Sequence, residues 1–221
     1  MALHVGPVLW LSHKCGGQRS TSRIQPRRVG ADNWCSMPRA TARDMPRSSE
    51  ILVLLDSIPG EFAAYAFSNV LIACWPKRSQ VPGVTMLADI RSQYLANHPE
   101  GASLIHLSGD ASLPDAETSE AWVDMMKRYS DRLRCIGVVS LERGFGASAL
   151  RSWVTDKRML QAPGEFKMRF DSSADGLLEW LPDEHERRTG VRLNRALLMR
   201  HLRWLIDECV LAHAPSQASR D

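Results

Sequence analysis

Segments with the pattern of strands alternate with segments with the pattern of helices from residue 67 to residue 181, and this alternation constrains the fold more than any other feature of the chain. Such alternation is typical of α/β domains, in which helices connect parallel strands. We therefore predict an α/β domain with a small mixed, mostly parallel sheet and helices packed on it. The crossover connections are expected to be right-handed.

Apolar runs, helical spacing and breaker residues place the individual elements. The predicted strands cover residues 51–58, 67–75, 102–107, 135–141 and 166–170. The predicted helices cover residues 84–96, a segment around Trp122, and residues 147–158 and 173–181. The helix around Trp122 has the clearest apolar stripe, with Thr118 or Ser119 as its predicted N-cap. That stripe consists of Trp122, Met125, Met126, Tyr129 and Leu133.

Residues 1–47 differ in composition from the rest of the chain. They are rich in Arg, Ser, Gly and Thr and show no periodicity after Leu11, so we expect disorder. Three interpretations stay open: a basic flexible tail, an organellar transit peptide, or upstream sequence translated from a start codon placed too early. We favour the third, with Met45 as the true start. The expected organisation is the tail 1–47, an α/β domain 48–182, a C-terminal amphipathic helix 183–213 and a disordered tail 214–221.

Basic charge is concentrated in the tail and not in the predicted domain. Residues 1–50 contain eight Lys or Arg and three Asp or Glu, which leaves 20 basic and 22 acidic residues in 51–221. A nucleic-acid-binding domain concentrates positive charge, because neutralising phosphates supplies much of its affinity. We therefore expect no nucleic-acid partner.

The cysteines favour a reducing compartment. There are five, none in a Cys-x-x-Cys pair, and Cys74 and Cys135 lie inside apolar runs. This pattern is typical of buried free thiols, so we predict a cytoplasmic protein. The longest aliphatic run, residues 51–55, is far shorter than the roughly 20 residues of a membrane-spanning helix, so no membrane span is expected.

The order of two initial strands followed by alternating helices and strands resembles the STAS domain of sulfate transporters and anti-sigma-factor antagonists. Residues 166–181, FKMRFDSSADGLLEWL, are similar to the last strand and last helix of bacterial STAS-like proteins, in which a strand ending in Phe leads to a Ser-rich cap and an aliphatic-Glu-Trp-Leu helix. The resemblance covers roughly half of the chain by the count of elements. It implies a binding and switching module without enzymatic activity.

The resemblance also implies a position for a regulatory serine, at the start of the helix after the third strand, where a partner kinase would phosphorylate it. By position, this loop begins with Ser108 and Ser112 and leads to Thr118 and Ser119. The Asp-Ser-Ser-Gly or Asp-Ser-Thr-Gly signature of the family is not present in it. A phosphate at a helix N-terminus is favoured by the free N–H groups there, but Ser and Thr are also the usual capping residues, and we favour simple capping.

One segment has the form of a cofactor motif. Residues 144–149, GFGASA, follow a predicted strand and open a helix, and Asp171 ends the next strand. This is the order of a dinucleotide fingerprint. Too little chain follows to build a nucleotide-binding half, so we interpret Gly144 and Gly146 as a tight turn with close helix packing, and we predict no cofactor and no metal.

A long amphipathic helix is predicted from residue 191 to residue 211. Its apolar stripe includes Leu198, Leu202 and Leu205, and an adjoining basic stripe consists of Arg192, Arg195 and Arg203. The stripe either packs back on the sheet, which we favour, or docks onto a partner protein or a second copy.

Together these observations predict a non-enzymatic, STAS-like module that binds another protein or itself. The alternative is an enzyme of unknown class with a pocket at the carboxyl ends of the strands, formed by residues 108–118 and 142–147. Open parallel sheets bind their ligands at that edge.

Overall fold

The computed structural model describes residues 50–128, 132–142, 144–155 and 166–210. The predictions for residues 1–47 and 214–221, for Tyr129 and for the end of the helix at Arg158 lie outside these residues. The described residues form a six-stranded sheet with helices on it, so the α/β class is confirmed.

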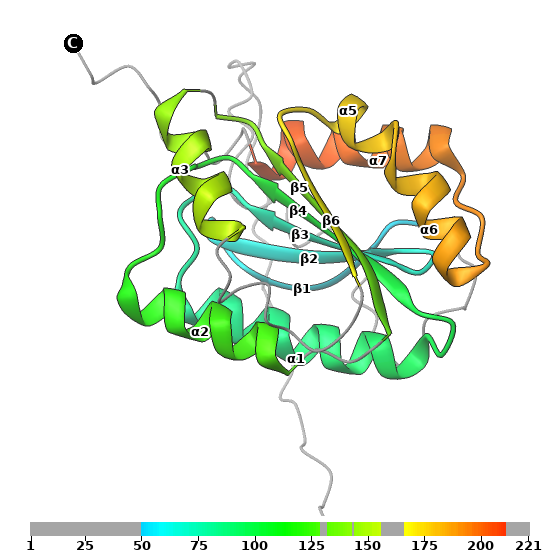
Figure 1. Ribbon diagram of the computed structural model, residues 1–221, viewed down its shortest axis with the longest axis horizontal. Helices are drawn as coiled ribbons and strands as arrows, with labels where there is room; N and C mark the ends of the chain where they lie inside the picture. Colours follow the sequence, from blue (N-terminus) through cyan, green and yellow to red (C-terminus); the bar gives the residue numbers. More distant parts are fainter. Residues whose placement is uncertain (1–49, 129–131, 143, 156–165, 211–221) are drawn as a thin grey trace, which may run out of the picture. The chain divides into compact units, whose positions relative to one another are not determined.

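The strands and helices alternate along most of the described chain (Figure 1). The strands are β1 (Val53–Ile58), β2 (Phe62–Phe67), β3 (Val70–Trp75), β4 (Ala102–Ser108), β5 (Leu133–Ser140) and β6 (Lys167–Asp171). The helices are α1 (Val81–Asn97), α2 (Ala116–Lys127), α3 (Phe145–Val154), α5 (Ala174–Leu178), α6 (Leu181–Thr189) and α7 (Arg195–Leu205), and α7 continues into the π-helical turn η2 (Ile206–Val210).

The strands lie in the sheet in the same order as in the sequence. β1 pairs with β2 and β2 with β3 in antiparallel fashion, whereas β3 to β6 are all parallel. The sheet is therefore mixed and mostly parallel, as predicted. Because a parallel pair needs a crossover, α1, α2 and α3 each connect two of these strands.

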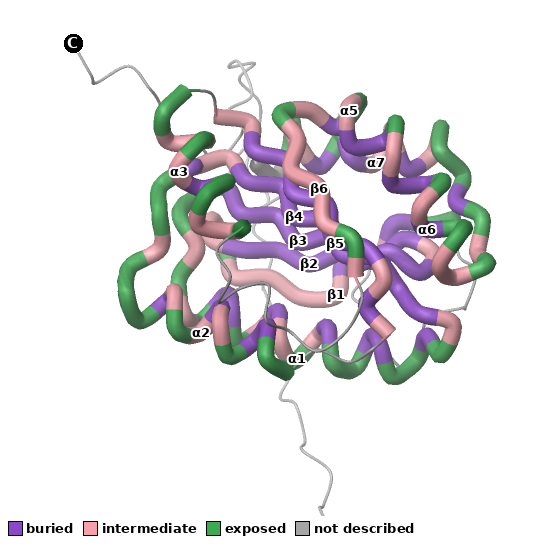
Figure 2. Tube along the Cα trace, viewed as in Figure 1, coloured by how far each residue is buried: buried purple, intermediate pink, exposed green. Residues whose placement is uncertain are grey.

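Helices cover both faces of the sheet, and Figure 1 shows α1 and α2 along one side and α5, α6 and α7 along the other. Side chains of a strand alternate between the faces. On β3, Leu71 and Trp75 belong to the apolar cluster under α1 and α2, whereas Ile72 and Cys74 belong to the cluster under α5 and α7. The central strands β2, β3 and β4 are buried throughout, as Figure 2 shows. Cys74 and Cys135 are buried and form no disulfide, as predicted.

The prediction of one strand over residues 67–75 was wrong, because two strands meet there. β2 and β3 form a hairpin in which Phe67 pairs with Val70 and the turn consists of Ser68 and Asn69. Ser68 adopts φ 52°, a left-handed conformation in which Gly and Asn are the usual residues. The sequence therefore lacks the usual hairpin signal, and the alanines of β2 have low strand propensity.

The helix α2 begins and ends at residues other than those predicted. Its N-cap is Asp115, whose side chain accepts a hydrogen bond from the backbone N–H of Thr118, so neither Thr118 nor Ser119 is the cap. Trp122, Met125 and Met126 are buried on its inner face as expected. Leu133 is the first residue of β5 and not part of the helical stripe.

The C-terminal segment contains two helices where the sequence predicted a single one from residue 191. The charged run from residue 183 to residue 188 lies in α6, where Arg187 and Arg188 both pair with Glu184 and lower the pKa of its carboxyl to about 2. The second helix, α7, begins only at Arg195, after the N-cap Asn194, so Arg192 lies before the helix.

The apolar stripe of α7 packs on the sheet, so the packing interpretation is confirmed. Leu198, Leu202 and Leu205 are fully buried in the same cluster as residues of the first strands. Arg203 forms an ion pair with Asp175, and Arg195 donates to the carbonyl oxygen of Leu178. The arginines therefore connect α7 to α5, and the buried leucines of α7 belong to the core of the α/β domain.

We predict that Leu198→Ala lowers the free energy of unfolding by about 3 kcal/mol, because it removes buried methyl groups and leaves a cavity. Urea unfolding followed by circular dichroism measures the change. Arg200→Ala, at an exposed position of the same helix, is the control and should shift stability by less than about 0.5 kcal/mol. An unchanged unfolding midpoint for Leu198→Ala would contradict the packing described above.

Candidate functional site

A cavity lies between the sheet and the helices α2 and α3. Its floor consists of residues from β4, β5 and β6, and its sides come from both helices and from the loop after β4. A water-sized sphere can occupy about 70 Å³ of it, and the total space between the atoms is about 650 Å³ when the part open to solvent is included. The enclosed part is smaller than the several hundred Å³ usual for drug-sized ligands, so it suits a small molecule that extends toward the opening.

The lining of the cavity is mainly apolar and rich in tryptophan. Trp75, Trp122 and Trp153 come from the end of β3, from α2 and from α3. The rings of Trp75 and Trp122 are 5.4 Å apart, and those of Trp122 and Trp153 are 6.3 Å apart in an edge-to-face arrangement. The other apolar lining residues are Met126, Ile136, Val138, Leu150, Val154 and Met168.

His106 is a polar residue in the floor of the cavity. Nε1 of Trp75 donates a hydrogen bond to Nδ1 of His106 over 3.2 Å. Burial, together with the positive charge of Arg91, lowers the pKa of His106 to about 3, so the ring is neutral at pH 7. The ring of Trp122 packs edge to face against the imidazole, with the two ring centres 5.4 Å apart.

The loop after β4 supplies the polar part of the lining. Ser108 Oγ donates to the carbonyl oxygen of Asp110, and the side chain of Asp110 accepts from the backbone N–H of Ser112. Across the cavity, Trp122 Nε1 donates to Ser79 Oγ over 3.1 Å. These contacts form turns and orient the indole ring, so this part of the lining is structurally fixed.

The four hydroxyl residues of the predicted regulatory loop separate into two pairs. Ser108 and Ser112 line the cavity. Thr118 and Ser119 lie in the first turn of α2, where the side chain of Thr118 is 1% exposed and Ser119 Oγ lies 3.5 Å from the carbonyl oxygen of Pro114. A phosphate on Thr118 would therefore require this turn to open.

Glu142 and the described residues 144–147 do not line the same cavity. Glu142, Gly144 and Ala147 line a separate hollow at the end of β5, together with Ser140, whose buried Oγ has no hydrogen-bond partner among the described residues. Gly144 precedes α3 with φ 90°, and a Cβ on Gly146 would be 3.4 Å from that of Ala111. The geometry therefore agrees with a tight turn and close helix packing in the GFGASA segment.

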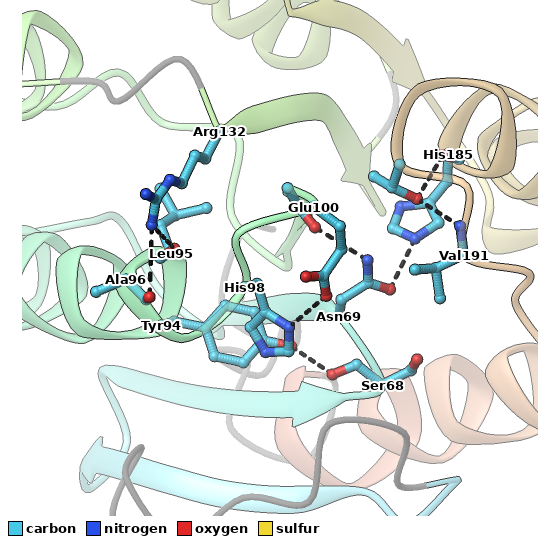
Figure 3. Close-up of polar contacts among 12 residues, drawn as sticks. Ser68, Asn69, Tyr94, Leu95, Ala96, His98, Glu100, Arg132, His185 and Val191 are labelled. Atoms are coloured by element: carbon cyan, nitrogen blue, oxygen red, sulfur yellow. Dashed lines mark hydrogen bonds and ion pairs between the residues drawn. The ribbon is translucent and has the colours of Figure 1, made fainter.

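A second polar cluster lies at the opposite, amino-terminal end of the parallel strands (Figure 3). His185 of α6 donates from Nε2 to Oδ1 of Asn69 over 2.7 Å, and Ser103 Oγ lies 2.7 Å from its Nδ1. Asn69 also donates to the carbonyl oxygen of Gly101. Burial lowers the pKa of His185 to about 4, so the neutral ring accepts at Nδ1 from the hydroxyl of Ser103.

The order Ser103–His185–Asn69 is that of a nucleophilic triad, but the cluster has a structural role here. All three side chains are 0% exposed, and none of them lines a cavity among those described. A nucleophile has to reach its substrate, which this serine does not. The cluster instead connects α6 to the β2–β3 turn and β4, and Figure 3 shows Tyr94 donating to the carbonyl oxygen of Ser68 in the same turn.

No group of three or more His, Cys, Asp or Glu side chains within the described ranges is placed to bind a metal ion. In the same part of the chain, no helix combines the length and the apolar character that crossing a bilayer requires.

No protein-family model, no curated protein and no solved structure matches this chain. The sequence indicates one part of the cavity lining, the loop from Ser108 to Ser112, but not the three tryptophans. The signal was present in the seven tryptophans, an unusual number for 221 residues. Their convergence could not be read from the sequence, because the three that line the cavity lie on separate elements.

We predict that the contribution of His185 to stability decreases as the pH falls below 6.5. The folded state holds this ring neutral down to about pH 4, whereas the unfolded chain binds a proton near pH 6.5, so acid favours unfolding in that window. The unfolding free energy of wild type minus that of His185→Gln should therefore be roughly 3 kcal/mol larger at pH 7.5 than at pH 4. Urea titrations at both pH values measure the difference.

The control for this pH effect is Ser92→Ala, at an exposed position of α1, which should follow wild type at both pH values. A stability difference between wild type and His185→Gln that does not change with pH would contradict a neutral buried imidazole.

Proposed function

We propose that this chain is a binding module for a small, mostly apolar molecule, which it holds in the tryptophan-lined cavity. The observation behind the proposal is the apolar, tryptophan-rich lining of the cavity, because transferring an apolar ligand from water to such a lining is favourable. Flat aromatic walls favour a flat ligand, since rings stack or meet edge to face. The site lies toward the carboxyl ends of β3 and β4, where open sheets bind ligands.

Binding without chemistry is favoured over the enzyme alternative. His106 has too low a pKa to take up a proton near pH 7, and a general base needs a pKa near the working pH. The hydroxyl of Ser108 is engaged with a backbone carbonyl group. The loops 108–118 and 142–147 do contact each other, because Glu142 accepts a hydrogen bond from the backbone N–H of Ala111, but Glu142 and Gly144 line a different hollow from Ser108 and Ser112.

A STAS-like regulatory role is a second candidate, in which the rim of this region binds another protein. It is supported by the exposure of Phe145, 89%, at the start of α3, and of Leu113, 45%, in the loop beside the cavity. The alternation from β3 onward agrees with the resemblance, although three strands and not two precede α1. We place this role in the cytoplasm, in agreement with the buried cysteines that form no disulfide.

We predict saturable binding of naphthalene, which is flat and apolar and matches the aromatic lining. We expect a Kd on the order of 10–100 µM, which corresponds to about 0.6 kcal/mol for each of its ten heavy atoms and lies between the values for drug-sized and very small ligands. The indole N–H signals of Trp75 and Trp122 in ¹H–¹⁵N NMR spectra should shift with the ligand concentration. A wild-type protein whose indole signals do not respond would contradict the proposal.

A matched pair of variants locates the binding. Val154→Trp adds a ring to the lining of the cavity and should weaken naphthalene binding at least about tenfold by occupying the space. Val123→Trp makes the same change at a half-buried position on α2 that does not line the cavity and should leave binding unchanged. Equal weakening by both variants would place the ligand elsewhere.

A further inference from the structure

The hydrogen-bond geometry of His106 fixes which of its ring nitrogens bears the hydrogen. Trp75 Nε1 can only donate, so the nitrogen that it contacts, Nδ1 of His106, has to accept. A neutral imidazole has a single N–H, and it is therefore on Nε2. Among the described residues, no acceptor contacts this Nε2, and the ring lines the cavity.

This N–H is a polar group beside the apolar β5 and β6 part of the cavity floor. The neighbouring floor residues Ile136, Val138 and Met168 offer no strong acceptor, and Trp122 donates to Ser79 on the other side. In the free protein, water can satisfy the N–H. A ligand that displaces this water without an acceptor of its own leaves a buried donor unpaired, which is unfavourable.

We infer that the ligand bears a hydrogen-bond acceptor, such as a ring nitrogen or a carbonyl oxygen, at its buried end, and that His106 selects for it. The inference rests on the proposed function, because it specifies the chemical class of ligand for the same cavity. His106 thus acts as a specificity-determining residue: the tryptophans supply most of the binding energy, and the imidazole sets which end of the ligand enters first.

The charges near His106 oppose a cationic ligand at this end. Three tryptophans could by themselves accept a cation over their ring faces. However, the N–H of His106 carries partial positive charge, and Arg91 is close enough to lower the pKa of His106. The carboxylate of Asp110 lines the same cavity and disfavours an anion, so the acceptor should belong to a neutral group.

Naphthalene and quinoline test the inference, because they share shape and size and differ in one ring nitrogen that accepts a hydrogen bond. Binding of each is measured by NMR titration at about pH 8, where quinoline is neutral. We expect the ratio of the naphthalene Kd to the quinoline Kd to be about tenfold larger in wild type than in His106→Phe, because one neutral hydrogen bond contributes about that factor. His106→Gln, which can accept from Trp75 and also donate into the cavity, should retain part of this preference.

The outcomes separate this inference from the proposed function. An equal preference in wild type and His106→Phe, with both compounds bound, would overturn the inference and leave apolar binding intact. If wild type binds neither compound, both proposals fail. If thermal unfolding shows that His106→Phe does not fold, wild type is compared with His106→Gln instead. A preference of wild type for naphthalene over quinoline would then overturn the inference.

Discussion

The alternation of side chains across one mixed sheet is the constraint on which the rest of the structure depends. Every second residue of β3 and β4 faces α1 and α2, and the residues between them face α5 and α7. Both sets are mainly apolar, so both faces need a cover. The C-terminal helices therefore complete the fold, and the close approach of Leu177 to Gly137, where a Cβ would be 2.5 Å from Leu177 Cδ1, shows how tightly α5 covers the second face.

Two buried histidines show how burial leads to different roles. His185 has a partner at each ring nitrogen, Asn69 and Ser103, and lines no described cavity, so its polar atoms are used within the fold. His106 has Trp75 at one nitrogen and faces the cavity with the rest of its ring. Both rings are neutral because burial disfavours the charged form. The number of hydrogen bonds that the protein itself supplies therefore separates a structural histidine from one that can meet a ligand.

The sequence located the candidate site only in part, for a physical reason. The loop from Ser108 to Ser112 follows a buried strand, and parallel strands bring such loops to one edge of the sheet, so its place was predictable. The cavity itself depends on how far α2 and α3 stand from the sheet, which is set by the sizes of side chains on several elements. The indole of Trp122 and the imidazole of His106 meet only after folding, since they are on different elements.

What the sequence by itself determined is the α/β class, the parallel part of the sheet and the burial of Cys74 and Cys135, because these follow from local periodicity and apolar runs. The tertiary structure alone decided that the chain turns at Ser68 between two strands. The left-handed backbone conformation there is unfavourable for serine, but the pairing of β2 with β3 compensates for its cost. It also decided that the stripe on α7 is core and not a docking surface. A helical stripe has the same spacing in either case, and only the presence of an apolar face opposite it distinguishes the two.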